Sequence, residues 1–119
     1  MGREIITIGY SSLSNSVQEI ELPMQKDEVE ILIAVQGDYV DPIKREDVRM
    51  IHLDSFGAAK SRNVILKEAK GEIVFFGDDD MRWDESGLKR TIDYFQVNQS
   101  VDLVLCQSEN EFGSLRKRY

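Results

Sequence analysis

The stretch that decides the fold is Ile73-Val74-Phe75-Phe76-Gly77-Asp78-Asp79-Asp80. Its four consecutive apolar residues predict a strand that is buried on both faces, which is typical of parallel sheets. Three carboxylates directly after the strand repel one another unless a cation or hydrogen bonds compensate them. Hard cations such as Mg²⁺ and Mn²⁺ prefer oxygen ligands, but Asp is also a favoured residue of solvated turns. The stretch alone leaves a metal site and an acidic turn equally open.

The composition is that of one globular domain. The chain has 119 residues, 41% hydrophobic and 31% charged, so we expect residues 1–119 to form a single domain. The net charge of −7 argues against nucleic-acid binding, because that binding relies on Lys and Arg to neutralise phosphates. There is no apolar leader or long apolar run, and the single cysteine, Cys106, excludes an internal disulfide. We therefore expect a cytoplasmic protein.

Apolar runs alternate with helical patterns along the chain. The runs predict strands at Ile5–Ile8, Val29–Val35, Val48–Leu53, Ile73–Phe76 and Val101–Gln107. The helical patterns predict a short helix on which Leu13, Val17 and Ile20 share a face, a helix from Gly57 to Lys70, and one that begins at Asp84 or Ser86. We expect Asp54 or Ser55 to cap the middle helix and Gly71 to follow it at the C′ position.

This alternation predicts an α/β fold with a mostly parallel sheet and helices on both faces. Ligands of such sheets bind outside the carboxyl ends of the strands. Three segments follow the predicted strand ends, namely Gly9–Ser12, Gln36–Asp38 and Gly77–Asp80. We therefore expect these three segments to converge on one ligand-binding edge.

Arg62 lies within a predicted packed face of the helix from Gly57 to Lys70. Its spacing from Ala58, Ile65 and Ala69 puts all four residues on one side of the helix, and the other three are apolar. Arg62 then either extends to solvent or meets a carboxylate, a phosphate or a base, for which its planar guanidinium is suited. A nucleoside diphosphate bound through a metal ion fits both the arginine and the aspartates. The cation also offsets the repulsion between an anionic ligand and an acidic protein.

Two stretches resemble a known family. They are Gly57-Ala58-Ala59-Lys60-Ser61-Arg62-Asn63 and Glu68-Ala69-Lys70-Gly71-Glu72-Ile73-Val74-Phe75-Phe76-Gly77-Asp78-Asp79-Asp80. They are similar to the G-x-x-x-x-R-N helix, the A-x-G-E turn and the strand leading into D-x-D of family-2 glycosyltransferases. The resemblance runs from about Glu4 to Gln107, the family's N-terminal nucleotide-binding half. It implies a Rossmann-like GT-A sheet and a hexosyltransferase-type donor site for a nucleotide-diphosphate sugar, in particular a UDP-sugar, bound with Mn²⁺ or Mg²⁺.

The resemblance also implies roles for individual residues. Asp78 and Asp80 match the D-x-D, which holds the divalent metal and touches the ribose and diphosphate, and Asp79 fills the middle place. Arg62 matches an arginine that lies near the nucleotide. Its neighbour Asn63 matches a structural position.

Four further residues match the expected nucleobase pocket. Tyr10 and Ser11 correspond to the segment after the family's first strand, which lines that pocket. After the second strand the family carries an acid that contacts uracil. Here Gln36 takes that place unless Asp38 is shifted into it, and a glutamine amide can both donate to and accept from a pyrimidine edge.

The sequence provides no catalytic residue. The family's acceptor-binding half and its general base are expected beyond the point where this chain stops, and Glu109 and Glu111 come too early for the base. We therefore interpret the chain as the donor-binding part of a glycosyltransferase, an enzyme of the hexosyltransferase type, and the alternative is a truncated or regulatory nucleotide-binding module without transfer activity. A phospho-acceptor receiver domain is disfavoured, because Gly9–Ser12 contains no acid.

Three features outside the motifs have ordinary explanations. His52 has no metal-type partner nearby in sequence, so we expect a structural role. Trp83 either packs on a donor sugar or caps the core, and core packing is the favoured interpretation. The cluster Arg116-Lys117-Arg118 is either a solvated chain end or a contact with an anionic membrane surface, which leaves a peripheral location at the inner face of the membrane open.

Overall fold

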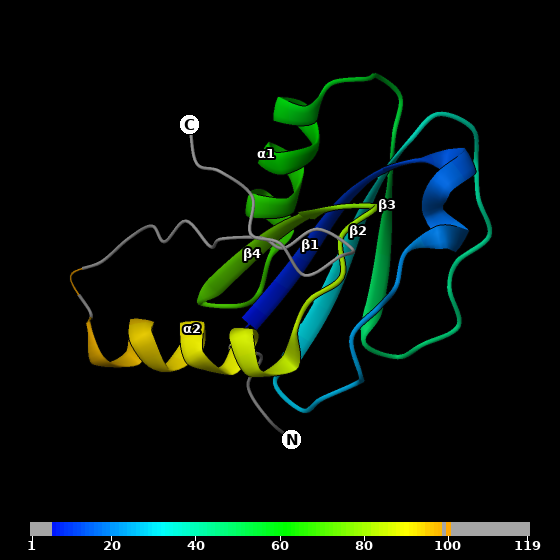
Figure 1. Cartoon of the computed structure of the whole chain (residues 1–119). Helices are drawn as coiled ribbons and strands as arrows, with labels where there is room; N and C mark the ends of the chain where they lie inside the picture. Colours follow the sequence, from blue (N-terminus) through cyan, green and yellow to red (C-terminus); the bar gives the residue numbers. More distant parts are fainter. Residues whose placement is uncertain (1–5, 99, 101–119) are drawn as a thin grey trace. The chain divides into compact units, whose positions relative to one another are not determined.

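The computed structural model describes residues 6–98 and residue 100 (Figure 1). The predicted strand Val101–Gln107, Cys106, Glu109, Glu111 and the cluster Arg116-Lys117-Arg118 lie outside these residues. The chain divides into two compact units between Asp84 and Glu85, and each is described by itself. That residues 1–119 form a single domain stays a prediction.

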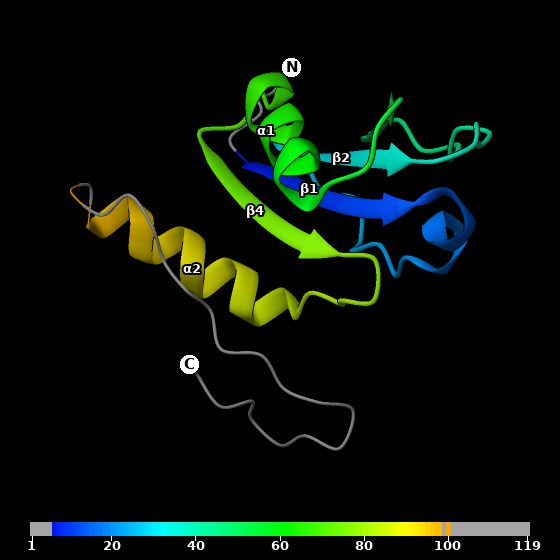
Figure 2. The same ribbon diagram turned by 90° about the horizontal axis from the view of Figure 1, so that it is seen from above.

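The first unit is built on a four-stranded, all-parallel sheet with the order β3-β2-β1-β4 (Figure 1). The strands are β1 (Ile6–Leu13), β2 (Val29–Gln36), β3 (Val48–Leu53) and β4 (Ile73–Asp78). The unit also contains a 3₁₀ helix η1 (Ser14–Glu19) and the helix α1 (Ala58–Glu68), and the second unit contains α2 (Glu85–Val97). Figure 2 shows α1 lying over β1 and β2, which it contacts. The predicted α/β class and the parallel, Rossmann-like sheet are confirmed.

Strand β1 is longer than the sequence suggests. Residues Gly9–Ser12 were expected to form a loop. In the structure all four pair with β2, and the first three, up to Ser11, also pair with β4. The expectation is wrong because hydrogen bonding to a strand on each side outweighs the weak local preference of Gly and Ser for turns. The carboxyl end of β1 therefore lies at Leu13.

The element after β1 has the expected place but a different geometry. It is the 3₁₀ helix η1, which buries Val17 and leaves Ile20 directly after its end, also buried. Leu13, expected on the same helical face, ends β1 and is 47% exposed. The three-residue turn of a 3₁₀ helix aligns positions i and i+3, which suits Val17 and Ile20 but not a stripe that starts at Leu13.

Helix α1 begins without the expected cap. Its N-cap residue is Gly57, with φ +142° and no side-chain hydrogen bond, rather than Asp54 or Ser55. The Gly57 amide donates instead to Oε1 of Gln36, at 2.6 Å, so a side chain from the end of β2 binds the start of the helix. This bond ties the entry of α1 to the carboxyl edge of the sheet.

The core between α1 and the sheet needs a glycine in β1. Leu32, Ala34 and Ile65 have no exposed surface, and the half-buried Leu53, Ala69 and Val74 pack around them. A Cβ on Gly9 would lie 2.5 Å from Cγ2 of Ile65, well inside van der Waals contact. Glycine at this position therefore lets α1 approach the sheet closely.

Strand β4 is less buried than its apolar sequence predicts. Phe75 is 6% exposed, whereas Phe76, on the opposite face, is 37% exposed. In the part of the chain that the structure describes, β4 is an edge strand, with β1 as its partner. The face that carries Phe75 is buried, whereas on the other face Val74 packs against the core and Phe76 is exposed, so the prediction of burial on both faces is met only in part.

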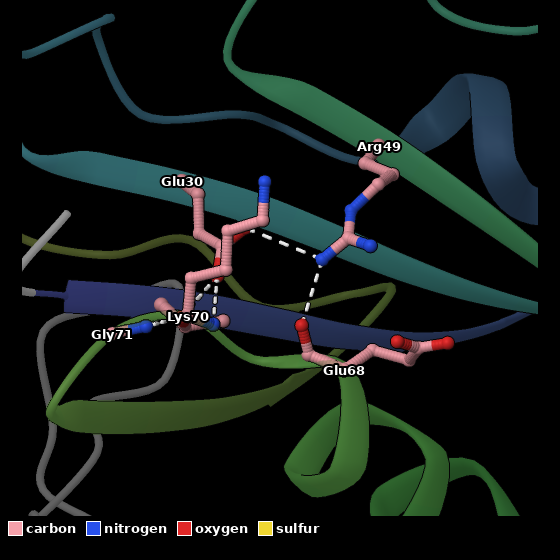
Figure 3. A network of polar contacts seen from close by, with 6 residues as sticks. Glu30, Arg49, Glu68, Lys70 and Gly71 are labelled. Atoms are coloured by element: carbon pink, nitrogen blue, oxygen red, sulfur yellow. Dashed lines mark hydrogen bonds and ion pairs between the residues drawn. The ribbon is translucent and has the colours of Figure 1, made fainter.

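A buried carboxylate organises the amino end of the sheet (Figure 3). Glu30, on β2, is 6% exposed and accepts hydrogen bonds at 2.6 Å from the Thr7 hydroxyl and from the Lys70 amide. Arg49 lies 3.5 Å from the other carboxylate oxygen and donates to the Glu68 carbonyl at 2.7 Å. Glu30 thus connects β1, β2 and β3 to the end of α1.

Gly71 belongs to the same end of the sheet. Its amide donates to Oγ1 of Thr7 at 3.0 Å, and a Cβ on Gly71 would lie 2.5 Å from the Thr7 amide nitrogen. The expectation that Gly71 occupies the C′ position is wrong, because the C-cap residue of α1 is Ala69, which puts Lys70 at C′, and Gly71 has no positive φ. The A-x-G-E turn needs glycine for its close approach to β1.

Candidate functional site

The three aspartates form a turn at the carboxyl end of β4. Asp78 is the last residue of the strand, and its carbonyl accepts the Met81 amide at 3.1 Å, which closes a four-residue turn. Asp79 is half-buried and its carboxylate accepts the Ser12 hydroxyl at 3.1 Å. The carboxylates of Asp78 and Asp80 are exposed and have no hydrogen bond or ion pair to any described residue. The sheet thus fixes the turn while two of its three acids face solvent.

The end of β1 lies beside this turn. Ser11 pairs with Asp78 in the parallel register and is partly exposed, so the structure brings it next to the aspartates. Tyr10 is one residue earlier and points to the other face of the sheet, where it has no exposed surface. In this structure its ring offers no surface on which a nucleobase could stack.

Tyr10 instead meets Trp83 inside the first unit. Burial raises the pKa of Tyr10 to about 12, while the nearby Trp83 indole and the charge of Arg45 lower it in part. Neither the Tyr10 hydroxyl nor the Trp83 indole nitrogen forms a hydrogen bond of acceptable distance and angle with a described residue. The proximity of the two groups is therefore a packing contact.

The end of β2 forms the third part of the edge. Gln36 pairs with Leu13 and is 8% exposed, and its amide oxygen is occupied by the Gly57 amide. Asp38 is exposed. Gly37 has φ +114°, and a Cβ there would lie 2.7 Å from Oγ of Ser14, so the segments after β1 and β2 are in contact.

A shallow, open depression of about 470 Å³ lies beside this segment, at the ends of β2 and β3. Its lining residues are Gly37, Tyr39, His52, Leu53 and Asp54. Tyr39 stacks on His52 with ring centroids 4.8 Å apart, and Nε2 of His52 accepts the Val40 amide at 3.2 Å. His52 thereby shapes the segment that carries Asp38.

Arg62 does not lie on the packed face of α1. Among the α1 residues whose side chains the structure describes, Ser61 and Ile65 have no exposed surface, whereas Arg62 is exposed. The expectation is wrong because a pattern of 4, 3 and 4 residues defines a face only to within about one residue, or 100° of rotation. Arg62 has no partner among the described residues, so its guanidinium extends to solvent.

The residues fit a metal ion that a ligand helps to hold. Within the described residues no group of three or more His, Cys, Asp or Glu side chains converges as a metal cluster. Mg²⁺ is usually bound by one or two carboxylates together with substrate phosphates, and does not need an all-protein cage. Asp78 and Asp80, as unpaired oxygen donors, match that arrangement, whereas Asp79 is engaged by Ser12.

Sequence reasoning did not identify two of these contacts. Ser12 had no assigned role, although alternation along β1 places it on the same face as Tyr10 and opposite Ser11. The packing of Trp83 against Tyr10 joins residues that are far apart in the sequence, so no local pattern indicates it.

No helix of the described part of the chain is long and apolar enough to cross a membrane.

Comparison with known proteins identifies the family. The sequence matches the family model for glycosyl transferase family 2 over residues 15–119, which is most of the chain. No curated protein and no solved structure gives a significant match. The matched range includes Gln36, Arg62 and the three aspartates, and begins after Ser11. The chain therefore belongs to glycosyl transferase family 2.

Proposed function

We propose that the carboxyl edge of β1, β2 and β4 binds a nucleotide-diphosphate sugar, in particular a UDP-sugar, for glycosyl transfer. The observation that carries the proposal is the pair of exposed carboxylates, Asp78 and Asp80, which the protein holds on a fixed turn and leaves without partners. Two unpaired negative charges two residues apart favour a cation between them. Asp78 and Asp80 would hold a Mn²⁺ or Mg²⁺ ion there, which would supply positive charge to stabilise the leaving diphosphate.

The other residues of the edge would surround the rest of the donor. Ser11 lies beside Asp78 and can donate to the ribose or a phosphate. Arg62 extends from the first half of α1 and can reach a phosphate or a base. Gln36 and Asp38 would contact the base, through the amide NH₂ of Gln36, since its oxygen is already bound to Gly57.

Asp79 and Tyr10 would act indirectly. Asp79, bound to Ser12, would hold the turn in place next to the nucleotide. Tyr10 is buried and lies beside Gly77, its partner on β4, so we assign it to the wall of the site rather than to a stacking surface.

Thermal stability tests the donor site directly. UDP at about 100 times its Kd, with Mn²⁺ or Mg²⁺, should raise the free energy of unfolding by about 2.7 kcal/mol if only the folded state binds. Asp78→Asn and Asp80→Asn should each remove this stabilisation, whereas Asp41→Asn, a change at an exposed acid in the loop after β2, should not. UDP compared with GDP, ADP and CDP identifies the base. The absence of stabilisation by any nucleoside diphosphate with either metal would contradict the proposal.

A second measurement separates an enzyme from a binding module. If the 119-residue chain releases UDP from a UDP-sugar, alone or with an added acceptor, it is active in transfer or hydrolysis. If it binds the UDP-sugar with metal but releases no UDP, it is a nucleotide-sugar-binding module. No described residue is assigned here as the general base that an inverting transfer requires.

A further inference from the structure

Trp83 folds back under the strand that leads into the aspartates. Its indole meets Phe75 edge to face, with ring centroids 5.3 Å apart and an interplanar angle of 75°. The same indole lies against Gly77, where a Cβ would be 3.4 Å from its Cζ2 and Nε1 atoms. Trp83 thus packs against the last residues of β4 before the turn, although it follows the turn in the sequence.

Tyr10 completes the contact from the neighbouring strand. It pairs with Gly77 across β1 and β4, and it is fully buried. The Trp83 indole lies beside this pair, at ordinary contact distance from where a Gly77 side chain would begin. The residues Tyr10, Phe75, Gly77 and Trp83 form a cluster that we call the latch.

The latch fixes both ends of the aspartate turn. Gly77 immediately precedes Asp78, and Trp83 follows Asp80 by three residues. Within the turn, the Met81 amide bonds to the Asp78 carbonyl and Ser12 bonds to Asp79. The exposed carboxylates are therefore held between two packed points, although they repel each other.

The latch contains polar atoms that a purely structural core would not need. The Tyr10 hydroxyl and the Trp83 indole nitrogen are both buried without a hydrogen-bond partner among the described residues. Burying such atoms costs free energy, which Phe or Leu at either position would avoid. The Trp83 indole is the polar neighbour of the Tyr10 hydroxyl, so the latch joins β1 to the segment that follows the aspartate turn.

We propose that Trp83 is a positioning residue for the metal site. By packing on Gly77 and Phe75, it keeps Asp78 and Asp80 in place before the ligand arrives, so less ordering is needed when the metal and diphosphate bind. Trp83 itself does not touch the ligand. The inference rests on the proposed function for its ligand, but the fixed turn can be examined without one.

The first test compares Trp83→Phe with Ile31→Val. Both changes remove buried apolar atoms, and Ile31 lies in the amino-terminal half of β2, outside the latch and the aspartate turn. Trp83→Phe should weaken binding of Mn²⁺ with UDP, measured by calorimetry on folded protein, by roughly tenfold or more. Ile31→Val should leave the Kd unchanged. Equal Kd values for the two variants would overturn the inference, because a merely structural role changes only stability.

The second test needs no ligand. Amide hydrogen exchange of Met81 reports the bond that closes the aspartate turn. Exchange should be faster in Trp83→Phe than in Ile31→Val, after correction for the global stability of each variant, and equal rates would overturn the inference. Phe75→Leu, which removes the ring that the Trp83 indole meets edge to face, should accelerate the same amide if Trp83→Phe does not fold. If the wild-type chain binds no nucleotide, the proposed function fails while this test still decides whether Trp83 holds the turn.

Discussion

The two ends of the sheet both carry acidic side chains, but only one end neutralises them. At the amino end, the Glu30 carboxylate is buried and receives two hydrogen bonds and a nearby arginine. At the carboxyl end, Asp78 and Asp80 are exposed and have no partner among the described residues. A buried charge must be compensated by groups of the protein, whereas an exposed charge is solvated by water and remains available to a ligand. The difference teaches that the paired acid is structural and the unpaired acids are candidates for binding.

The largest expected effect is the loss of the paired acid. Glu30→Ala leaves the Thr7 hydroxyl and the Lys70 amide without their acceptor and Arg49 without its ion-pair partner, and should lower the free energy of unfolding by about 3–5 kcal/mol. Urea unfolding measures the change. Glu21→Ala is the control, because Glu21 is exposed and 3.6 Å from Arg82, and it should cost less than about 1 kcal/mol. Equal losses would mean that the amino-end network does not stabilise the fold.

The next effect concerns Tyr10 and appears at high pH. Below pH 10, Tyr10 is protonated in both the folded and the unfolded chain. Above pH 10, the unfolded chain releases the proton while the folded chain keeps it until about pH 12, so stability falls across this window. The loss should be roughly 2–3 kcal/mol. Lys side chains titrate in the same range, so the measurement is the difference between the wild type and Tyr10→Phe, which should lack this part of the slope. Parallel curves would contradict the burial of the phenol.

A smaller effect on stability is expected for alanine substitutions at two glycines, Gly71 at the amino end of the sheet and Gly77 at the carboxyl end. Gly71→Ala places a Cβ against the backbone of Ile6 and Thr7, which cannot move easily, and should cost about 1–3 kcal/mol. Gly77→Ala meets only the Trp83 ring at 3.4 Å and should cost less than about 1 kcal/mol. Thermal unfolding of both variants checks the order. A larger loss at Gly77 would mean that the latch is more rigid than the connection after α1.

The smallest effect is expected for the unpaired acids. Without ligand, Asp78→Asn and Asp80→Asn should change the free energy of unfolding by no more than about 0.5 kcal/mol, since neither side chain has a partner to lose. Urea unfolding in the presence of a chelator measures this. A loss comparable with that of Glu30→Ala would show that the aspartates are structural, and would weaken the proposed donor site.

The sequence predicted the strands better than their ends. The apolar runs located β2, β3 and β4 to within two residues, because a strand buried in a parallel sheet is recorded directly as consecutive apolar side chains. The end of β1 was missed because Gly9–Ser12 has the composition of a loop. Pairing with strands on both sides, which depends on residues far away in the sequence, decided its structure.

The candidate site also combines features that the local sequence predicted with features that contacts between distant residues decided. The family motif located the aspartates, and the structure places them at the carboxyl edge of the sheet, where ligands of parallel sheets bind. The orientation of Arg62 was not predictable, because one residue of rotation separates the packed face of α1 from the exposed one. Nor was the burial of Tyr10, which depends on the exact register of β1 against β4.

By itself, the sequence determined that an α/β fold with a parallel sheet carries three aspartates after one of its strands, because hydrophobic periodicity and strand-end motifs are local properties. Only the tertiary structure decided which charges have partners. Asp79 is bound by Ser12, 67 residues away, and Glu30 by the amide of Lys70, 40 residues away. Charge compensation depends on contacts between distant segments, so it cannot be read from neighbouring residues. These contacts leave Asp78 and Asp80 as the exposed, unpartnered acids of the turn.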